Sequence, residues 1–322
     1  MEQSDHIDVF DFPIFRHIYR ERAKFKRISL ACCYICAEYI KQNVQKYIIS
    51  KKPWNTPRLL FLPLYRLCIS YIIIYKLILI SGYGKAKGLA IITGASQGIG
   101  AVIAAGLATD GYRVVLIARS KQNLEKVHDE IMRSNKHVQE PIVLPLDITD
   151  CTKADTEIKD IHQKYGAVDI LVNAAAMFMD GSLSEPVDNF RKIMEINVIA
   201  QYGILKTVTE IMKVQKNGYI FNVASRAAKY GFADGGIYGS TKFALLGLAE
   251  SLYRELAPLG IRVTTLCPGW VNTDMAKKAG TPFKDEEMIQ PDDLLNTIRC
   301  LLNLSENVCI KDIVFEMKKS II

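Results

Sequence analysis

Histidine is scarce in this chain of 322 residues, and clustered cysteine is nearly absent. The chain has 5 histidines, and its 8 cysteines are scattered except for Cys32, Cys33 and Cys36. A zinc site needs a second cysteine pair or histidines at ligand spacing, and the sequence offers neither. We therefore expect no metal site. We interpret the cysteines as small apolar residues in a reducing compartment.

Long uncharged apolar runs are also missing. The most apolar segment, residues 59–80, is interrupted by Pro63, Arg66 and Lys76. An arginine or lysine near the centre of a spanning helix costs roughly 2.5 to 3.5 kcal/mol, so a membrane span here would be strained. The first apolar run follows a mixed-charge start and no small-residue cleavage site follows it, which argues against a cleavable signal peptide.

A net positive charge is absent after residue 88. Residues 1–88 carry a net charge of +9 and hold 8 of the 15 tyrosines, whereas the remainder carries −2. Basic residues interleaved with apolar stretches favour an anionic membrane surface over a nucleic acid. The chain therefore divides into a basic, mostly helical N-terminal extension, residues 1–86, and a near-neutral domain, residues 87–322.

The way in which the extension meets a membrane is open. We favour attachment in the membrane plane; the alternatives are a span or hairpin with residues 28–40, and packing of these helices on the domain or on a second subunit. The positive-inside tendency opposes moving residues 1–58 out of the cytoplasm, so we expect the domain on the cytoplasmic side.

From Gly88 onward, short apolar runs alternate with helical patterns. This alternation predicts an α/β fold, a Rossmann-like doubly wound parallel sheet of about seven strands with helices on both faces. The expected strands are residues 89–93, 113–118, 141–146, 168–172, 218–224, 261–266 and 310–316, and the longest expected helices are residues 190–214 and 236–259. Ligands of such sheets bind beyond the carboxyl ends of the strands.

A glycine-rich turn follows the first expected strand. The sequence Thr93-Gly-Ala-Ser-Gln-Gly-Ile-Gly100 stands between a strand and a helix over residues 99–108. Glycines at such a turn let the backbone approach a pyrophosphate at the helix N-terminus. The spacing differs from the common Gly-x-Gly-x-x-Gly pattern, so it indicates a variant of that dinucleotide site.

Ser225, Tyr238 and Lys242 predict a proton-transfer site. Tyr238 and Lys242 stand four residues apart in a helical pattern, so both side chains leave the same face. A fixed positive charge beside a phenol favours the phenolate, and we expect it to lower the pKa of Tyr238 and make it a general acid-base residue. Ser225 ends the preceding strand and can donate a hydrogen bond to a carbonyl oxygen held near the phenol.

Together with Asn197, Pro268 and Gly269, these motifs resemble the short-chain dehydrogenase/reductase family over residues 86–322. The resemblance implies hydride transfer between a nicotinamide and a carbonyl or secondary alcohol, and pairing into a homodimer or homotetramer. It implies the catalytic set Ser225, Tyr238, Lys242 and Asn197. Asn197 would hold the water of a proton relay; the alternative is a packing asparagine at a helix kink.

The second expected strand ends at Ala118 and is followed by Arg119, Ser120 and Lys121. An acidic residue there would bind the ribose of NAD, whereas arginine accommodates the 2′-phosphate of NADP, so we expect NADP(H) in preference to NAD(H). By resemblance, Asp147 and the amide of Ile148 hold the adenine. The expected cofactor-binding set is Gly94, Ser96, Gln97, Gly98, Ile99, Gly100, Arg119, Asp147, Ile148, Asn173, Tyr238, Lys242, Pro268, Gly269, Val271 and Thr273.

One segment departs from the family. Asn173-Ala-Ala-Ala176 stands where the family has Asn-Asn-Ala-Gly, which changes the packing expected along the cofactor but removes no catalytic group. By resemblance, Val271 and Thr273 reach the nicotinamide carboxamide and the phosphates.

The substrate is a small molecule whose identity the sequence leaves open. Residues 274–290 form the expected lid, and six apolar side chains near it favour a lipophilic carbonyl such as a 3-oxoacyl, ketosphingoid, retinoid or steroid compound: Phe178, Phe232, Trp270, Met275, Phe283 and Met288. The packing of these six against the body of the domain is the alternative to a pocket. A small 3-hydroxy acid or aldehyde is an alternative substrate, and a non-catalytic nucleotide-binding scaffold is an alternative function.

Overall fold

The computed structural model describes residues 86–134 and 138–321, which contain one seven-stranded sheet. All strand pairs are parallel, and their order is β3-β2-β1-β4-β5-β6-β7. The strands are β1 (Leu89–Thr93), β2 (Arg113–Ala118), β3 (Ile142–Pro145), β4 (Val168–Asn173), β5 (Gly218–Val223), β6 (Ile261–Pro268) and β7 (Asp312–Phe315). The predicted Rossmann-like α/β fold is confirmed, and the predicted strand ends shift by at most two residues.

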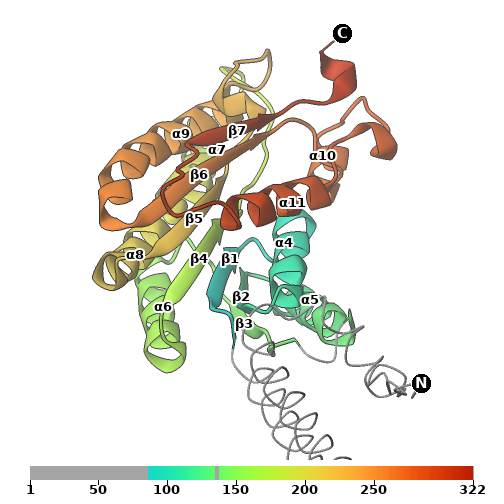
Figure 1. The fold of residues 1–322 in the computed structure, drawn as a ribbon. Helices are drawn as coiled ribbons and strands as arrows, with labels where there is room; N and C mark the ends of the chain where they lie inside the picture. The colour runs from blue at the N-terminus through green and yellow to red at the C-terminus, as the bar shows by residue number, and fades with distance from the viewer. Residues whose placement is uncertain (1–85, 135–137, 322) are drawn as a thin grey trace, which may run out of the picture. The chain divides into compact units, whose positions relative to one another are not determined.

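Helices cover both faces of the sheet (Figure 1). On one face lie α4 (Gly98–Thr109), α5 (Lys121–Ser134) and α11 (Pro291–Leu302); on the other lie α6 (Cys151–Tyr165), α8 (Ala200–Gln215) and α9 (Gly236–Leu256). The shorter helices α7 (Val187–Met194) and α10 (Asp274–Lys278) follow the turns after β4 and β6. Pro291 stands in the first turn of α11, where its missing N–H is not needed.

The strands are apolar on both sides because helices bury both sides. Ile92, Val172 and Phe221 point into the core shared with α4, α5 and α11. Ile91, Leu171 and Ile220, each one position earlier, point into the core shared with α6 and α8. The strand interiors therefore form the hydrophobic core, and the candidate site residues lie at the carboxyl ends of the strands.

The long helix predicted over residues 190–214 is interrupted. Its pattern is continuous in sequence, but the chain forms α7, then a π-helical turn, Glu195–Ile199, and then α8. A π turn accommodates one extra residue in a helix and reorients the side chains on either side of it, often at functional sites. Here the turn contains Asn197, one of the candidate catalytic residues.

Residues 1–85 and the candidate span at residues 59–80 lie outside the described part of the chain, so the division into residues 1–86 and 87–322 stays a prediction. Within residues 86–134 and 138–321, no helix has both the length and the apolar character of a membrane span.

Candidate active site

Ser225 stands at the carboxyl end of β5 and caps a short 3₁₀ turn, Arg226–Ala228. Its Oγ accepts a hydrogen bond from the backbone N–H of Ala227 at 3.1 Å and donates to the carbonyl of Pro268 at 3.5 Å. The hydroxyl is therefore fixed by the turn on one side and by the end of β6 on the other.

Tyr238 and Lys242 lie on one face at the start of α9, as their spacing predicted. The Lys242 Nζ lies 5.5 Å from the centroid of the Tyr238 ring. Lys242 is only 1% exposed and donates to the carbonyl of Val223 at 3.3 Å, while the edge of the Phe178 ring meets Tyr238 with a centroid distance of 5.0 Å. Tyr238 itself keeps a partly exposed surface. The structure thus places an ammonium group beside the ring of a partly exposed tyrosine.

The expected effect of this pair on the tyrosine is wrong. Burial raises the pKa of Tyr238 to about 12, and a hydrogen bond from Ser225 to the phenol oxygen opposes this only in part. Burial also lowers the pKa of Lys242 to about 8, with Cys267 acting in the opposite direction. Desolvation is the largest cause of both shifts, because it disfavours the charged form of each group. At neutral pH the phenol is protonated and the lysine is mostly charged.

Asn197 is fully buried in the π turn between α7 and α8. Its Oδ1 accepts from the N–H of Met177 at 2.8 Å, and its Nδ2 donates to the carbonyl of Met177 at 2.9 Å and to Thr241 Oγ1 at 3.1 Å. The side chain therefore ties the segment after β4 to α9, next to Lys242. The packing role at a helix kink, the alternative for Asn197, is observed, and the predicted role in holding the water of a proton relay stays a prediction.

The glycine turn between β1 and α4 is shaped by close backbone approach. Gly94 and Gly98 have φ angles of 69° and 57°, in the left-handed region that favours glycine. A β-carbon on Gly94 would lie 2.9 Å from the Cα of Ala175, and one on Gly100 would lie 2.8 Å from the carbonyl carbon of Gly94. Gly94 and Gly100 therefore exclude a side chain, which lets the turn pack against its own backbone and against Ala175.

The start of α4 suits an anion. Its N-cap residue, Gln97, makes no side-chain capping hydrogen bond, and the first turn carries no acidic residue. Ser96 is partly buried and Ile99 packs against the core beneath the turn. The first N–H groups of the helix are thus free to bind phosphate oxygens.

Thr93 is a site residue that the candidate set lacks. Its Oγ1 donates to Asn173 Oδ1 at 3.1 Å and accepts from the N–H groups of Ala174 and Ala175 at 3.0 and 3.1 Å. It therefore holds the alanine-rich segment against the glycine turn. The available signal was its place directly before Gly94, at the end of a buried strand.

Asn173 gives a further indication of a ligand. It is fully buried, and its Nδ2 has no hydrogen-bond partner within the described residues. This unused donor fits a bound dinucleotide, whose oxygens accept hydrogen bonds.

Three predicted cofactor residues follow the two strands on one side of β1. Arg119 follows β2, and Asp147 and Ile148 follow β3. Arg119 is exposed directly after Ala118. Asp147 is also exposed and accepts from the N–H and the hydroxyl of Thr149, while Ile148 is buried. Arg119 can reach a phosphate without breaking an internal contact.

The segment after β6 returns to the glycine turn. The N–H of Gly269 donates to the carbonyl of Phe315 on β7 at 2.9 Å. Val271 is buried, and Thr273 caps α10 and lies so close to the glycine turn that a β-carbon on Gly98 would be 3.3 Å from its Cγ2. The structure thus brings the expected nicotinamide and phosphate residues to one edge of the sheet.

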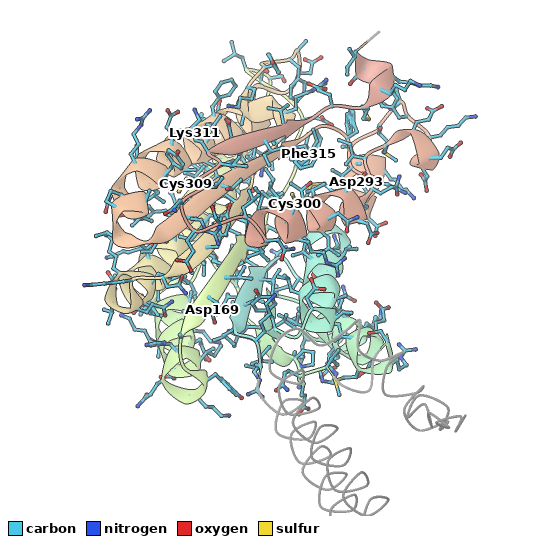
Figure 2. The ribbon with its side chains drawn as sticks, viewed as in Figure 1. Asp169, Asp293, Cys300, Cys309, Lys311 and Phe315 are labelled. Atoms are coloured by element: carbon cyan, nitrogen blue, oxygen red, sulfur yellow. The ribbon has the colours of Figure 1, made fainter. Side chains whose placement is uncertain are left out.

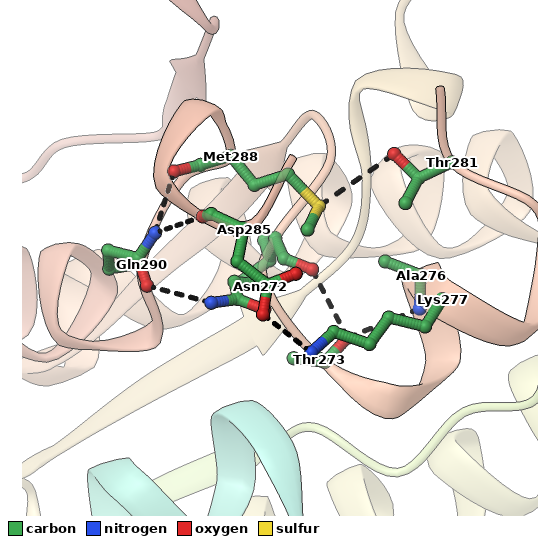
Figure 3. A network of polar contacts seen from close by, with 9 residues as sticks. Asn272, Thr273, Ala276, Lys277, Thr281, Asp285, Met288 and Gln290 are labelled. Atoms are coloured by element: carbon green, nitrogen blue, oxygen red, sulfur yellow. Dashed lines mark hydrogen bonds and ion pairs between the residues drawn. The ribbon is translucent and has the colours of Figure 1, made fainter. Parts of the chain in front are cut away.

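The predicted lid, residues 274–290, is held by a polar network (Figure 3). Gln290 accepts from Asn272 at 3.2 Å and donates to the carbonyls of Asp285 and Met288 at 2.8 and 3.0 Å. Lys277 pairs with Asp285 at 2.7 Å. The lid is therefore a folded segment with its own internal contacts, which the sequence pattern did not reveal.

The six apolar residues assigned to a pocket divide into two groups. Met288 is buried in the main core, and Trp270 and Phe283 pack against it, so for these three the alternative of packing holds. Of the other three, Phe178 contacts Tyr238, Met275 is partly buried, and Phe232 stays 48% exposed. The apolar surface near the phenol is therefore smaller than predicted.

Comparison with known proteins shows which family shares this sequence and fold. The sequence profile described as short chain dehydrogenase matches residues 88–282. The structure of a β-ketoacyl-ACP reductase from Bacteroides thetaiotaomicron is 96% identical, with a TM-score of 0.68, over 73% of this chain and 99% of that chain.

Two more distant structures contain a cofactor. An alcohol dehydrogenase from Thermococcus sibiricus, in complex with 5-hydroxy-NADP, is 30% identical over 72% of this chain and 97% of that chain, with a TM-score of 0.65. An actinorhodin polyketide ketoreductase with NADPH is 26% identical over 71% of this chain and 97% of that chain, with a TM-score of 0.66.

Proposed function

Because the chain belongs to the short-chain dehydrogenase family, whose members are oxidoreductases of carbonyl and CH–OH groups, we propose that it reduces a 3-oxoacyl thioester to the 3-hydroxyacyl product, with NADPH in preference to NADH. The observation that carries the proposal is the grouping of Ser225 and Lys242 around the partly exposed Tyr238.

When bound, the nicotinamide supplies the hydride, which adds to the carbonyl carbon of the substrate. Tyr238 donates its proton to the carbonyl oxygen, and its pKa of about 12 keeps that proton in place at neutral pH. The hydroxyl of Ser225 donates a hydrogen bond to the same oxygen as negative charge develops there. The ammonium of Lys242 stabilises the phenolate that remains on Tyr238.

The substrate class is supported by the 96% identity to a chain described as a β-ketoacyl-ACP reductase. The apolar edge formed by Phe178 beside Tyr238 suits the first carbons of an acyl chain. Preference for NADPH is supported by Arg119, exposed at the end of β2, and by related structures described with NADP or NADPH.

Residues 1–86 remain a proposed attachment to a membrane surface on the cytoplasmic side, supported by the net charge of +9 on residues 1–88. Pairing into a homodimer or homotetramer is supported by exposed apolar side chains near and along α8 and α9: Ile199, Tyr202 and Phe243.

The test is NADPH oxidation by the full chain with acetoacetyl thioesters, longer 3-oxoacyl thioesters, sterol ketones and short aldehydes. We expect thioester reduction, and we expect Tyr238→Phe to lower kcat by about a thousandfold because the proton donor is lost. The matched control is Tyr202→Phe, which removes an exposed hydroxyl on α8. Reduction of short aldehydes alone would replace the proposed substrate, and full activity in Tyr238→Phe would refute the mechanism.

A further inference from the structure

We propose that two ion pairs between the edge strand β7 and the turn after β5 position Ser225 for the reaction. Lys229 pairs with Asp312, and Arg226 pairs with Glu316. The inference rests on the proposed carbonyl reduction but not on the identity of the substrate. Nothing in the motif pattern of the family region predicts these four residues as part of the site.

The two pairs run side by side. Asp312 begins β7 and Glu316 directly follows it, so the four-residue spacing puts both carboxylates on one side of the extended chain. Arg226 and Lys229 are three residues apart on a 3₁₀ turn, where side chains at this spacing eclipse each other. The Arg226 Nη1 lies 3.0 Å from Glu316 Oε2, and Lys229 Nζ contacts Asp312 Oδ2.

The turn held by these pairs is the one that fixes the serine. Ser225 Oγ accepts from the N–H of Ala227, which lies between the two cations. Any rotation of the turn about the end of β5 therefore carries the serine hydroxyl with it. An error of about 1 Å at a reacting group can lower a rate by a hundredfold, so the direction of this hydroxyl matters to the reaction.

The same strand end also holds the cofactor segment. Phe315, at the end of β7 (Figure 2), accepts the N–H of Gly269 at 2.9 Å, and Pro268 stands opposite Phe315 in the strand register. The serine turn and the Pro268-Gly269 turn are thus attached to one short strand. This arrangement sets the distance between the serine hydroxyl and the cofactor side of the site.

The pairs are more enclosed than ordinary surface pairs. The side chains of Lys229 and Asp312 are 26% and 18% exposed, whereas those of the Lys213 and Glu255 pair between α8 and α9 are 40% and 57% exposed. The hydrogen bond to Asp312 raises the pKa of Lys229, which keeps its charge in place. Acidic residues on an edge strand also discourage pairing with other chains, so a test must separate that role from positioning.

The experiment compares Asp312→Asn and Glu316→Gln, singly and together, in the full chain. We expect the double variant to lower kcat by about tenfold while the KM for NADPH stays unchanged. The charge-reversed variant, Lys229→Asp with Asp312→Lys, restores an ion pair between the same two positions and should recover part of the lost kcat. Glu255→Gln, which breaks the exposed pair at 2.7 Å, is the matched control and should leave kcat unchanged.

The decisive measurement repeats the double variant in a Ser225→Ala background. If the pairs act through the serine, their loss has no further effect on kcat once the hydroxyl is gone. A second tenfold loss in that background would overturn the proposal, because the pairs would then act elsewhere.

Amide hydrogen exchange gives a readout that needs no activity. The N–H of Ala227 should exchange faster in the double variant than in the wild type, and unchanged exchange would overturn the proposal. A wild-type protein without activity on any carbonyl would instead refute the proposed function, so the two failures are distinguishable.

Discussion

Two rows of side chains cross the central strands on the same face, two residues apart, and they differ sharply in chemistry. The first row is apolar and consists of Ile91, Leu171, Ile220 and Val263, which stand opposite one another in the strand register. The second row lies nearer the carboxyl ends and consists of Thr93, Asn173, Asn222 and Thr265. Every member of both rows is at most 2% exposed.

The apolar row stabilises the fold, whereas the polar row holds the ligand edge at the expense of stability. Both side-chain polar atoms of Asn222, like the Nδ2 of Asn173, lack hydrogen-bond partners within the residues that the structure describes. A buried polar atom without a partner costs about 1 to 3 kcal/mol. Complete burial therefore stabilises the protein in the apolar row and costs stability in the polar row, although the two rows lie about 7 Å apart along the strands.

The largest expected effect comes from Lys242→Met, which removes the buried charge behind the second row. We expect kcat for reduction to fall by about a thousandfold, because the phenolate of Tyr238 loses its stabilising ammonium. We also expect the free energy of unfolding at pH 7 to rise by up to about 3 kcal/mol, since burial disfavours the charged lysine. Kinetics and urea unfolding measure the two effects.

The pH dependence of the wild type provides the check. The folded pKa of Lys242, about 8, lies below its ordinary value of 10.5, so between these values the unfolded chain binds more protons. The stability difference between Lys242→Met and the wild type should therefore shrink as pH rises from about 8 to 10.5. Wild-type reduction should weaken over the start of that range as the ammonium is lost. If the stability difference between Lys242→Met and the wild type did not change with pH, the lowered pKa of Lys242 would be contradicted.

Ile220→Ala in the apolar row should lower stability and leave kcat unchanged, the opposite of the effects expected for Lys242→Met. Deleting a fully buried isoleucine side chain destabilises a protein by about 2 to 5 kcal/mol, and we expect urea unfolding to show a loss of this size. The kcat of the folded fraction should not change, because Ile220 points into the core shared with α6 and α8. A large fall in kcat without loss of stability would break the distinction between the rows.

The smallest expected effect is that of Arg119→Asp at the exposed end of β2. The carboxylate would repel a 2′-phosphate and accept a ribose hydroxyl, so the preference for NADPH over NADH should fall by about tenfold or reverse. Stability should stay unchanged because Arg119 is exposed. Equal use of both cofactors by the wild type would show that Arg119 does not select the cofactor.

The sequence predicted most of the fold because its strands are short, apolar and separated by turn residues. β1 and β2 begin and end at the predicted residues, Leu89–Thr93 and Arg113–Ala118. The helix over residues 190–214 was predicted as continuous because helical spacing runs through the π turn at Glu195–Ile199, and a kink at Asn197 was only an alternative. In the structure Asn197 hydrogen-bonds the backbone of Met177, which is a tertiary contact that local spacing does not reveal.

The candidate site was predictable as a set of residues but less so as an electrostatic environment. Glycine spacing and the Tyr238 and Lys242 pair are local features, so the sequence carries them. The direction of the Tyr238 pKa shift depends on burial by segments distant in sequence, and the expectation from the pair alone was wrong. The ion pairs that hold the serine turn join residues 83 and 90 positions apart, beyond any local pattern.

The hydrogen bond between Thr93 and Asn173 joins residues 80 positions apart and has a consequence for biosynthesis. The glycine turn is translated early. The residues that pack against it, Ala174 and Ala175, leave the ribosome only after β2, β3 and their helices. Loop closure over such a separation is slow compared with local helix formation. Nascent chains shorter than about 175 residues should therefore gain no stability from added cofactor.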